Sequence, residues 1–338
     1  MKQIKIGIVG YGNIGKGVVK AVEASSDMDP VAVFTRRDPG ELIINNGRTP
    51  VYSIDDACKM VDDIDVMLLC GGSATDLPEQ GPHFAGMFNI VDSYDNHAKI
   101  PEYMAAIDEA AKNKTAIIST GWDPGMFSVM RVLFESIVPD GMTYTFYGRG
   151  VSQGHSNAIR KIKGVRDAVQ YTVPIENAVN EVRAGATNEM EPRQRMMREC
   201  YVVAEDGADI NELENTIKTM PHYFIDYDTT VTFITEQELK ENHSAMPHGG
   251  MVLRSGHTGT NNPEATGKDE TINKKNHVME FSLKLESNPE FTASIMVAYA
   301  RAAYHMAIKG DFGAKTVFDV PMTYLSEKNR KTLIKELL

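Results

Sequence analysis

The chain has few cysteines, no long apolar run and no excess of basic charge, and each absence narrows what it can be. Its three cysteines, Cys58, Cys70 and Cys200, show no Cys-x-x-Cys spacing, so we expect no disulfide framework and favour a reducing, cytoplasmic location. No apolar stretch approaches the roughly 20 residues that span a bilayer. The formal net charge of −11 repels polyanions, which argues against nucleic acid and anionic membranes as partners.

The length and the order of apolar segments predict the domain organisation. A chain of 338 residues is too long for one ordinary core and indicates two or three domains. Strand and helix patterns alternate over residues 1–122, which predicts an α/β fold with a doubly wound parallel sheet of the Rossmann type. Residues 123–290 contain longer strands with few helices between them, which predicts a second α+β domain on a mixed or antiparallel sheet. We expect the first domain to bind a dinucleotide, the second to bind substrate and to dimerise, and the helices of 291–338 to pack back on the first.

These patterns give explicit element boundaries. Strands are expected at 4–9, 31–34, 49–53, 65–70, 88–92 and 115–119, and then at 143–147, 200–204, 229–234, 251–254 and 278–285. Helices are expected at 16–24, 54–62, 100–112, 126–137 and 292–308, and the basic run 160–166 is expected to end another helix. The polar segment 258–275 is expected to be a mobile loop.

A glycine-rich turn directly follows the first predicted strand. Gly10, Gly12 and Gly15 form the pattern Gly-x-Gly-x-x-Gly where the strand gives way to a helical stretch. Gly10 permits a tight turn, Gly12 lets the backbone approach a pyrophosphate, and Gly15 lets the helix pack close to the strand. The helix N-terminus then offers N–H groups to the phosphates. The motif in this place predicts a dinucleotide site; a glycine turn that binds nothing is the alternative.

The second predicted strand ends in basic residues where an NAD-binding chain usually carries an acid. Residues 31–34 are apolar and lead into Thr35, Arg36 and Arg37. A carboxylate here would repel a 2′-phosphate, whereas guanidinium groups bind one in a bidentate manner. The pattern therefore favours NADP as the cofactor, with a solvated basic surface turn as the alternative.

Two carboxylates, Asp95 and Asp123, follow later strands of the first domain. Ligands of parallel sheets bind outside the carboxyl ends of the strands, so we expect both side chains near the nicotinamide. Carboxylates there suit a cationic substrate amine. Each aspartate could instead cap a helix, and for Asp123 the following Pro124 makes capping and ligand binding equally good interpretations.

The second domain contributes two polar turns that contain glycine. Residues 152–156, which include Gln153 and Gly154, can offer backbone N–H groups to a carboxylate, and residues 246–250 present His248. The histidines of this region have no spacing typical of a metal site and no acidic cluster beside them, so we expect no metal.

Seven motifs together resemble the meso-diaminopimelate D-dehydrogenase family. They occur in the family's order and cover most of the chain. The segment 119–127, Ser-Thr-Gly-Trp-Asp-Pro-Gly-Met-Phe, is far more distinctive than any dinucleotide fingerprint. The other six are 10–15 (Gly-Tyr-Gly-Asn-Ile-Gly), 35–37 (Thr-Arg-Arg), 72–76 (Gly-Ser-Ala-Thr-Asp), 92–97 (Asp-Ser-Tyr-Asp-Asn-His), 152–156 (Ser-Gln-Gly-His-Ser) and 246–250 (Met-Pro-His-Gly-Gly).

The resemblance implies an activity and a cofactor. The activity is a reversible, NADP-dependent oxidative deamination of the D-centre of meso-2,6-diaminopimelate, a reaction of lysine biosynthesis, carried out by a homodimer. The products would be ammonia and L-2-amino-6-oxopimelate, which cyclises to tetrahydrodipicolinate. The residues expected at the cofactor are Gly10, Gly12, Asn13, Ile14, Gly15, Thr35, Arg36, Arg37, Gly72, Ser73, Ala74, Thr75 and Asp92.

The resemblance also implies the residues that meet the substrate. Asp95, Asp123 and the indole of Trp122 would surround the reacting amino centre, and we expect the two carboxylates to share the proton transfers. Arg198 is preferred to its neighbours Arg193 and Arg195 because it abuts the strand at 200–204 as in the family. The remaining expected contacts are Gln153 and Gly154 at the nearby carboxylate, Thr172, Arg198, His248 and Asn276 at the distal L-centre, and Tyr147, which stands where some members carry Trp.

Three other interpretations remain open. A two-domain oxidoreductase of the glucose–fructose oxidoreductase type would place a Lys-Pro pair where this chain has Asp-Asn-His. A short-chain dehydrogenase would need a Tyr-x-x-x-Lys motif that is not found in the expected place. A non-catalytic NADPH-binding sensor would leave the carboxylates and the anion contacts of the second domain without a use.

Overall fold

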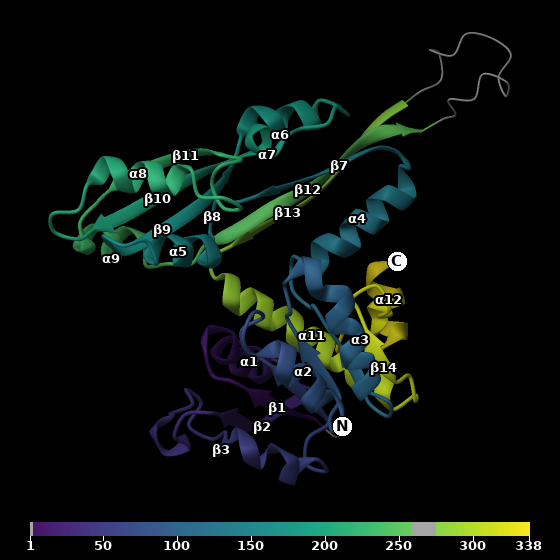
Figure 1. Cartoon of the computed structure of the whole chain (residues 1–338). Helices are drawn as coiled ribbons and strands as arrows, with labels where there is room; N and C mark the ends of the chain where they lie inside the picture. Colours follow the sequence, from purple (N-terminus) through teal and green to yellow (C-terminus); the bar gives the residue numbers. More distant parts are fainter. Residues whose placement is uncertain (1–2, 259–274) are drawn as a thin grey trace, which may run out of the picture. The chain divides into compact units, whose positions relative to one another are not determined.

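The computed structural model describes residues 3–258 and 275–338, which divide into two units (Figure 1). Unit 1 consists of Met1–Val129 and Pro289–Leu338, and unit 2 of Met130–Asn288. The predicted mobile loop at 258–275 lies outside the described residues, apart from its two end residues. None of the helices in the described ranges combines the length and the apolar character that crossing a membrane requires.

Unit 1 is built on a seven-stranded parallel sheet with the strand order β14-β6-β5-β4-β1-β2-β3. Its strands are β1 Ile4–Val9, β2 Met28–Thr35, β3 Val51–Ser53, β4 Val66–Leu69, β5 Ile90–Asp92, β6 Thr115–Ile117 and β14 Gly313–Lys315. Its helices are α1 Asn13–Glu23, α2 Leu77–Ala85, α3 Ile100–Ala110, the start of α4 Met126–Ile137, α11 Asn288–Ala307 and α12 Arg330–Leu337. Short 3-10 segments are η1 Pro39–Glu41, η2 Ile54–Met60, η3 His97–Lys99 and η4 Met322–Tyr324.

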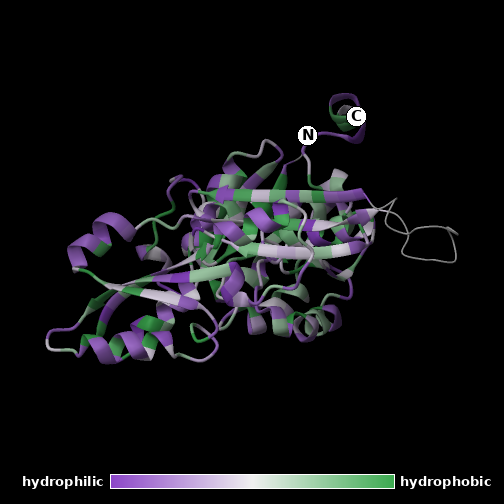
Figure 2. Cartoon of the chain, turned by 90° about the horizontal axis from the view of Figure 1, so that it is seen from above, coloured by the Kyte–Doolittle hydropathy of each residue, from purple (hydrophilic) through white to green (hydrophobic). Residues whose placement is uncertain are grey.

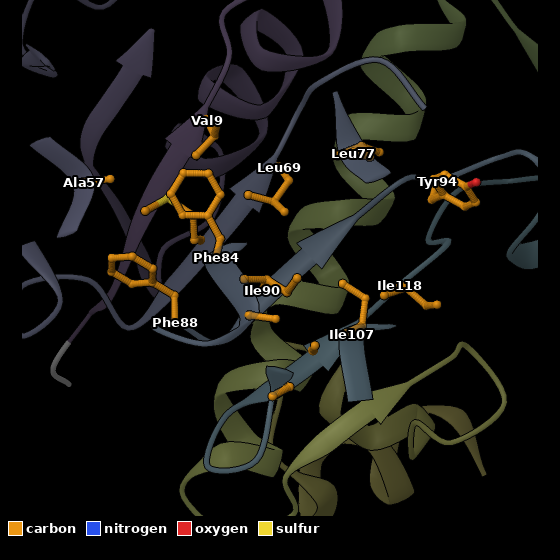
Figure 3. Packing of buried hydrophobic residues seen from close by; sticks show 14 of the residues in the cluster. Val9, Ala57, Leu69, Leu77, Phe84, Phe88, Ile90, Tyr94, Ile107 and Ile118 are labelled. Carbon is orange, nitrogen blue, oxygen red and sulfur yellow. The ribbon is translucent and has the colours of Figure 1, made fainter. Parts of the chain in front are cut away.

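The core of unit 1 lies against this sheet. The central strand β4 is buried along its whole length, as expected for a parallel strand covered on both faces. Figure 3 shows the large side chains of the cluster gathered about the strands, with Tyr94 at one end of it. This packing fixes the strand ends, from which the loops of the site emerge.

Unit 2 holds two smaller sheets. One has the order β11-β10-β9-β8 and is mixed, because β10 and β11 run parallel while the other pairs are antiparallel; the second is the antiparallel sheet β13-β12-β7. The strands are β7 Asp140–Tyr147, β8 Gly150–Val151, β9 Val165–Pro174, β10 Met196–Ala204, β11 Asp228–Phe233, β12 His248–Thr258 and β13 Lys275–Leu285. The helices are α5 Gln153–Arg160, α6 Glu176–Arg183, α7 Pro192–Arg195, α8 Ile210–Lys218 and α9 Glu236–His243.

The helices of unit 2 cover the sheets with their apolar sides. Hydrophobic and hydrophilic residues alternate along the helices (Figure 2). Helices α5 and α8 pack on one set of residues from β9 and β10, which includes Ala168 and Val202, and α9 packs through Leu239 on the set that includes Val169 and Val203. Helix α6 packs on the three-stranded sheet through Val179 and Val182. Consecutive strand residues point to opposite faces, so β9 and β10 are buried on both.

The predicted fold class is confirmed: a doubly wound parallel sheet is combined with a second α+β region on mixed and antiparallel sheets. Three details differ from the sequence prediction. Among its described residues, unit 2 has five complete helices and most of α4 rather than few helices. The run 160–166 is not a helix end throughout, because α5 stops at Arg160, Gly164 turns the chain with φ +92°, and β9 begins at Val165. The segment predicted as a helix at 54–62 is the 3-10 segment η2.

Candidate functional site

The glycine turn between β1 and α1 has the geometry of a phosphate loop. Gly10 adopts φ +91°, which a side chain would oppose, and a Cβ on Gly15 would lie 2.1 Å from the carbonyl oxygen of Gly10. A Cβ on Gly12 would meet nothing within 4 Å, so the backbone there is open to a ligand. Gly12 is also the N-cap of α1 and supplies no side-chain cap. The first turn of α1 therefore presents N–H groups and a positive dipole end at an open surface.

The end of β2 completes a groove beside this turn. The groove has a volume of about 340 Å³. The Thr35 hydroxyl accepts the Arg37 N–H at 3.1 Å, and the Arg37 guanidinium donates to the Tyr11 carbonyl at 3.3 Å. The side chain of Arg36 is 67% exposed and pairs with Asp76 at 2.9 Å. Because an ion pair at such an exposed guanidinium is weak, Arg36 is available to an anionic ligand such as a ribose phosphate.

The predicted cofactor residues fall into two groups. Those that line the groove are Gly10, Gly12, Thr35, Arg36, Arg37 and Gly72. Those that do not line it are Asn13, Ile14, Gly15, Ser73, Ala74, Thr75 and Asp92. In the second group, 73–75 form the turn before α2, and the Ser73 hydroxyl accepts the Asp95 N–H at 3.2 Å.

Asp92 requires a correction. We predicted a contact with the cofactor, but its side chain is fully buried. Its carboxylate accepts hydrogen bonds from the Tyr94 and Ser119 N–H groups at 3.0 Å and from the Tyr103 hydroxyl at 2.7 Å. Burial raises the pKa of Asp92, while these hydrogen bonds act in the opposite direction. The side chain thus serves the interior of the fold.

The strand-end turns of unit 1 carry the predicted catalytic residues. Asp95 is exposed, three residues after β5. Trp122 is buried and meets Phe127 edge to face, with ring centroids 5.2 Å apart. Asp123 is half-buried and precedes α4, whose first i→i−4 hydrogen bond runs from the Val129 N–H to the Gly125 carbonyl. Gly125, not Asp123, therefore occupies the N-cap position of α4.

In unit 2, a buried arginine has no carboxylate partner in the described part of the chain. Arg198 on β10 lies opposite Thr172 on β9, donates to the Thr172 hydroxyl, and stacks on the Tyr227 ring at 3.8 Å. Its Nε is buried without a hydrogen-bond partner. Burial lowers the pKa of Arg198. A buried guanidinium without a counter-ion is costly, so an anion that binds here would be stabilised.

Strand β8 brings His248 to the same cluster. Gly150 pairs with Thr172, and a Cβ on Gly150 would lie 2.6 Å from the His248 ring. Burial lowers the pKa of His248, so its imidazole is neutral at pH 7. His155 on α5 meets the Phe224 ring edge to face, with centroids 5.6 Å apart, and burial and the charge of Arg198 lower the pKa of His155 to about 4. A neutral hydrogen-bonding group beside a guanidinium suits a carboxylate ligand.

The other predicted substrate residues lie around this cluster or away from it. Gln153 and Gly154 are exposed at the start of α5, whose N-cap Ser152 makes no side-chain cap, so the N–H groups of its first turn face outward. Tyr147 ends β7 opposite Gly250, two residues after His248. These positions allow Gln153, Gly154 and Tyr147 to act near the buried arginine.

Asn276 lies far from His248 within the chain. The prediction that Asn276 contacts the same end of the substrate as His248 is therefore wrong for a single chain. On the ladder of β12 and β13, Asn276 pairs with His257, whereas His248 pairs with Leu285. Nine residues of strand, about 30 Å at the usual rise, separate the two ends. The asparagine beside the His248 turn is Asn288, whose N–H donates to the Met246 carbonyl at 3.2 Å. The sequence offered one signal for Asn288: it precedes Pro289 at the start of the long helix α11.

Among the described residues, no group of three or more His, Cys, Asp or Glu side chains is arranged to hold a metal ion. Tyr227 and His155, which complete the surroundings of Arg198, were not singled out from the sequence.

Comparisons with known proteins point to one family. A family model described as the diaminopimelic acid dehydrogenase C-terminal domain matches residues 121–287. The meso-diaminopimelate D-dehydrogenase of Ureibacillus thermosphaericus is 57% identical over 340 residues, covering 100% of both chains, and that of Corynebacterium glutamicum is 44% identical, covering 99% of both.

Solved structures agree with this match. The C. glutamicum DAP dehydrogenase in complex with DAP has a TM-score of 0.89 at 44% identity, and an engineered D-amino acid dehydrogenase bound to NADP+ has a TM-score of 0.83 at 43% identity; each comparison covers 100% of both chains. The matches extend over both units of the structure. The chain belongs to the meso-diaminopimelate D-dehydrogenase family.

Proposed function

We propose that this chain catalyses the reversible, NADP-dependent oxidative deamination of the D-centre of meso-2,6-diaminopimelate. The products are ammonia and L-2-amino-6-oxopimelate, which cyclises to tetrahydrodipicolinate; the reverse direction serves lysine biosynthesis. The observation that carries the proposal is the full-length match to dehydrogenases of this name. The strand-end carboxylates of unit 1 and the buried guanidinium of unit 2 supply the opposite charges that a substrate with two ammonium and two carboxylate groups requires.

The groove of unit 1 fits the cofactor. The N–H groups at the start of α1 can bind the pyrophosphate, and Arg36 and Arg37 can bind the 2′-phosphate. No carboxylate ends β2 to repel that phosphate. Bound NADP supplies the hydride chemistry at its nicotinamide ring. The protein supplies orientation and electrostatic stabilisation.

Asp95 and Asp123 carry the proton transfers at the reacting amine in this proposal. The substrate ammonium donates hydrogen bonds to their carboxylate oxygens and loses one proton to them. The Cα–H bond then breaks, and the hydrogen leaves with both bonding electrons as the hydride that bound NADP+ would accept, while the nitrogen lone pair forms the C=N bond. Water adds to this carbon and its protons pass through the two carboxylates, one of them to the nitrogen. The C=O bond then forms as the C–N bond breaks and ammonia leaves. Trp122 shields the reacting centre from solvent.

The distal end of the substrate binds to unit 2 in this proposal. Arg198 forms a charge-assisted hydrogen bond with a carboxylate, and Thr172 and His248 add neutral contacts. Gln153 and Gly154 bind the carboxylate of the reacting centre through the first turn of α5. Tyr147 shapes the pocket. The two ends of meso-diaminopimelate differ only in configuration, so fixing the L-end decides which Cα–H is oxidised.

The cellular and quaternary setting is part of the proposal. We assign dinucleotide binding to residues 1–122 with 291–338, and substrate binding and dimerisation to 123–290. The homodimer is carried over from the family resemblance. A cytoplasmic location fits the three free cysteines, of which Cys70 and Cys200 have pKa values raised to about 12 by burial and are inert thiols. Sedimentation velocity at micromolar concentration should give twice the chain mass.

A stereochemical assay tests the activity. The purified protein should produce NADPH from NADP+ with meso-diaminopimelate and release an equal amount of ammonia. It should be inactive with the L,L isomer, because that molecule has no D-centre. Oxidation of a hydroxy acid instead would indicate another oxidoreductase, and binding of NADPH without turnover of any isomer would indicate a sensor.

Asp123→Asn extends the assay to the mechanism. We expect kcat/KM for meso-diaminopimelate to fall by about 10²–10⁴-fold, the usual range for a general acid–base group, while the affinity for NADPH stays within threefold. Asp206→Asn, at a fully exposed position of unit 2, is the matched control and should retain wild-type rates. A fully active Asp123→Asn variant would remove this residue from the mechanism.

A further inference from the structure

A single buried carboxylate links two turns of unit 1 at the carboxyl ends of β5 and β6. Asp92 is the last residue of β5, and none of its surface is exposed. One carboxylate oxygen, Oδ1, accepts both the Tyr94 N–H and the Ser119 N–H, each at 3.0 Å. These two donors are 25 residues apart in the sequence. The carboxylate is therefore a bridge between two separate segments of backbone.

Each of these segments leads directly to a predicted catalytic residue. Tyr94 is followed by Asp95, whose own N–H is held by the Ser73 hydroxyl at 3.2 Å. Ser119 is followed by Thr120, whose N–H and hydroxyl both donate to the Asp92 carbonyl, at 2.9 and 2.7 Å. Trp122 and Asp123 come next in the chain.

The turn that contains Asp123 is held by hydrogen bonds between its own residues. Fixing the first residues of this turn therefore fixes the position of Asp123. The Phe127 N–H donates to the Trp122 carbonyl at 2.8 Å, and the Met126 N–H donates to the Gly121 carbonyl at 3.0 Å. Gly125 has φ +133°, and a Cβ there would lie 1.8 Å from the Gly121 oxygen. Anchoring Ser119 and Thr120 therefore anchors the whole turn.

A tyrosine fixes the second oxygen of the carboxylate. The Tyr103 hydroxyl, on α3, donates to Asp92 Oδ2 at 2.7 Å. Its ring stacks on Tyr94 with centroids 4.1 Å apart, at the end of the cluster where Figure 3 shows Tyr94. Gly81 on α2 leaves room for it, because a Cβ there would lie 2.1 Å from the Tyr103 oxygen. The carboxylate thus has a donor on each oxygen and no freedom to rotate.

The backbone of Ser119 is strained where it donates its hydrogen bond to Asp92. Ser119 adopts φ +57°, a conformation that costs a residue other than glycine about 1 kcal/mol or more. Its N–H faces Asp92 in that conformation, so the hydrogen bond helps to offset the cost. Such strain is typical of places where a side chain must be delivered to one position.

We propose that Asp92 is a positioning residue for the deamination: its one buried carboxylate holds both strand-end turns, and with them Asp95 and Asp123, in place. The inference rests on the proposed function. Two carboxylates that share proton transfer at one nitrogen must both lie within hydrogen-bond reach of it, and a displacement of about 1 Å can cost 10²-fold in rate. One bridge sets both positions together.

Three variants separate positioning from mere stability. Tyr103→Phe removes the donor to Oδ2 and keeps the ring stack; we expect kcat/KM for meso-diaminopimelate to fall about tenfold, mostly in kcat. Asp92→Ala removes the carboxylate, and with it the hydrogen bonds from Tyr94, Ser119 and Tyr103, and we expect a fall of 10²-fold or more. Asp92→Asn keeps an oxygen for the two N–H groups and an amide that can donate to Tyr103, so it should lose less than tenfold. The NADP+ dissociation constant should stay within threefold in all three, because the glycine turn is not held by this bridge.

The control for Tyr103→Phe is the same substitution at a tyrosine of unit 2. Tyr144→Phe in unit 2 removes another tyrosine hydroxyl, one that donates to the Asn188 carbonyl at 2.6 Å, and should leave kcat unchanged. If Asp92→Ala does not fold, Tyr103→Phe carries the test alone. Wild-type kcat in Tyr103→Phe overturns the inference and leaves the proposed function intact, provided that wild type oxidises meso-diaminopimelate. A wild type inactive with meso-diaminopimelate overturns the proposed function and this inference with it.

Discussion

Arg198 is a buried cation whose hydrogen bonds and charge are only partly satisfied within the described chain. Its guanidinium is buried, one nitrogen has no partner, and the groups that touch it are a hydroxyl and an aromatic ring rather than a carboxylate. The cation–π contact with Tyr227 offsets part of the lost hydration. A carboxylate bound at Arg198, as the proposed function requires, would offset more of this cost.

Arg198→Lys tests this at the residue scale. Lysine keeps the charge but cannot make the planar, bidentate contact with a carboxylate or stack as well on Tyr227. We expect KM for meso-diaminopimelate to rise by about 10–100-fold, the range for one charge-assisted hydrogen bond, with a smaller change in kcat. Steady-state kinetics measure the split between KM and kcat. Arg193→Lys, an exposed neighbour that donates to the Ile225 carbonyl, is the control, and an equal loss in both variants would contradict the assignment.

Single residues were predicted unevenly, for physical reasons. The glycine turn and the basic end of β2 have local chemistry that the sequence displays, and both line one groove. Asp92 ends β5, directly before the loop that carries Asp95. Its burial depends on tertiary packing, which the sequence does not display, so we predicted its carboxylate at the cofactor and not in the interior. Asn276 was misplaced because its distance from His248 depends on the register of a long hairpin, which the sequence does not reveal.

Strand β8, only two residues long, lies between two predicted substrate residues, Thr172 and His248. Its Gly150 pairs with Thr172 on one side and lies under the His248 ring on the other, and the Val151 N–H donates to the Pro247 carbonyl at 3.0 Å. Two residues thus connect the sheet that holds the buried arginine with the turn that holds the histidine. A short edge strand of this kind positions side chains rather than adding core area.

Gly150→Ala tests the role of this element. The new Cβ would lie 2.6 Å from the His248 ring and 2.7 Å from the His248 Cα, so both the ring and the backbone of this turn must shift. We expect KM for meso-diaminopimelate to rise at least tenfold and the melting temperature to fall by a few degrees, while the affinity for NADP+, which depends on unit 1, changes little. Kinetics, cofactor titration and thermal unfolding measure the three quantities. In the control Gly86→Ala the nearest atom would be at an ordinary 3.6 Å, and wild-type KM in Gly150→Ala would show that His248 is not placed by β8.

Element prediction succeeded where the pattern was periodic and failed where breakers interrupt it. Helix α4 begins and ends where predicted, because its apolar residues recur at helical spacing. Helix α2 was missed because Pro78, Gly81 and Pro82 lie within nine residues. The reason for Gly81, the close approach of the Tyr103 hydroxyl, is visible only in three dimensions. Strand β9 was missed because a basic run leads into it, and the turn at Gly164 that separates the two looks like an ordinary loop glycine.

At the scale of the whole molecule, the fold of unit 1 depends on the end of the chain. Residues after Pro289 supply α11 and the strand β14, which pairs in parallel with β6 at the edge of the sheet (Figure 1). Ala293 on α11 lies against Gly17 of α1, where a Cβ would come within 2.9 Å. A dinucleotide fold read only from the first part of the chain is therefore incomplete, because its last strand comes nearly 200 residues after β6.

The buried Arg301 on α11 ties this C-terminal segment to the start of the chain. It donates to both carboxylate oxygens of Asp27 at 2.6 and 2.8 Å, to the Leu325 carbonyl at 2.9 Å and to Glu327 at 3.3 Å. Burial opposes ionisation of Asp27, but the hydrogen bond and charge of Arg301 outweigh it and lower the pKa of that carboxyl. One guanidinium therefore links three segments that are far apart in the sequence.

Arg301→Met is expected to destabilise unit 1 by about 2 kcal/mol at pH 7, since it leaves two carboxylates and a carbonyl without their donor, and the partly exposed partners can regain water. The pH dependence follows from Asp27. Because its folded-state pKa lies below its unfolded value near 4, its contribution is complete above that pH and is lost as pH falls through the folded-state pKa. The gap in melting temperature between wild type and Arg301→Met should thus narrow below pH 4.

Calorimetry at pH 7 and pH 3 measures the gap, with Arg330→Met on the exposed start of α12 as the control. A gap that stays constant, or a control that loses as much, would show that Arg301 does not hold the C-terminal segment through Asp27.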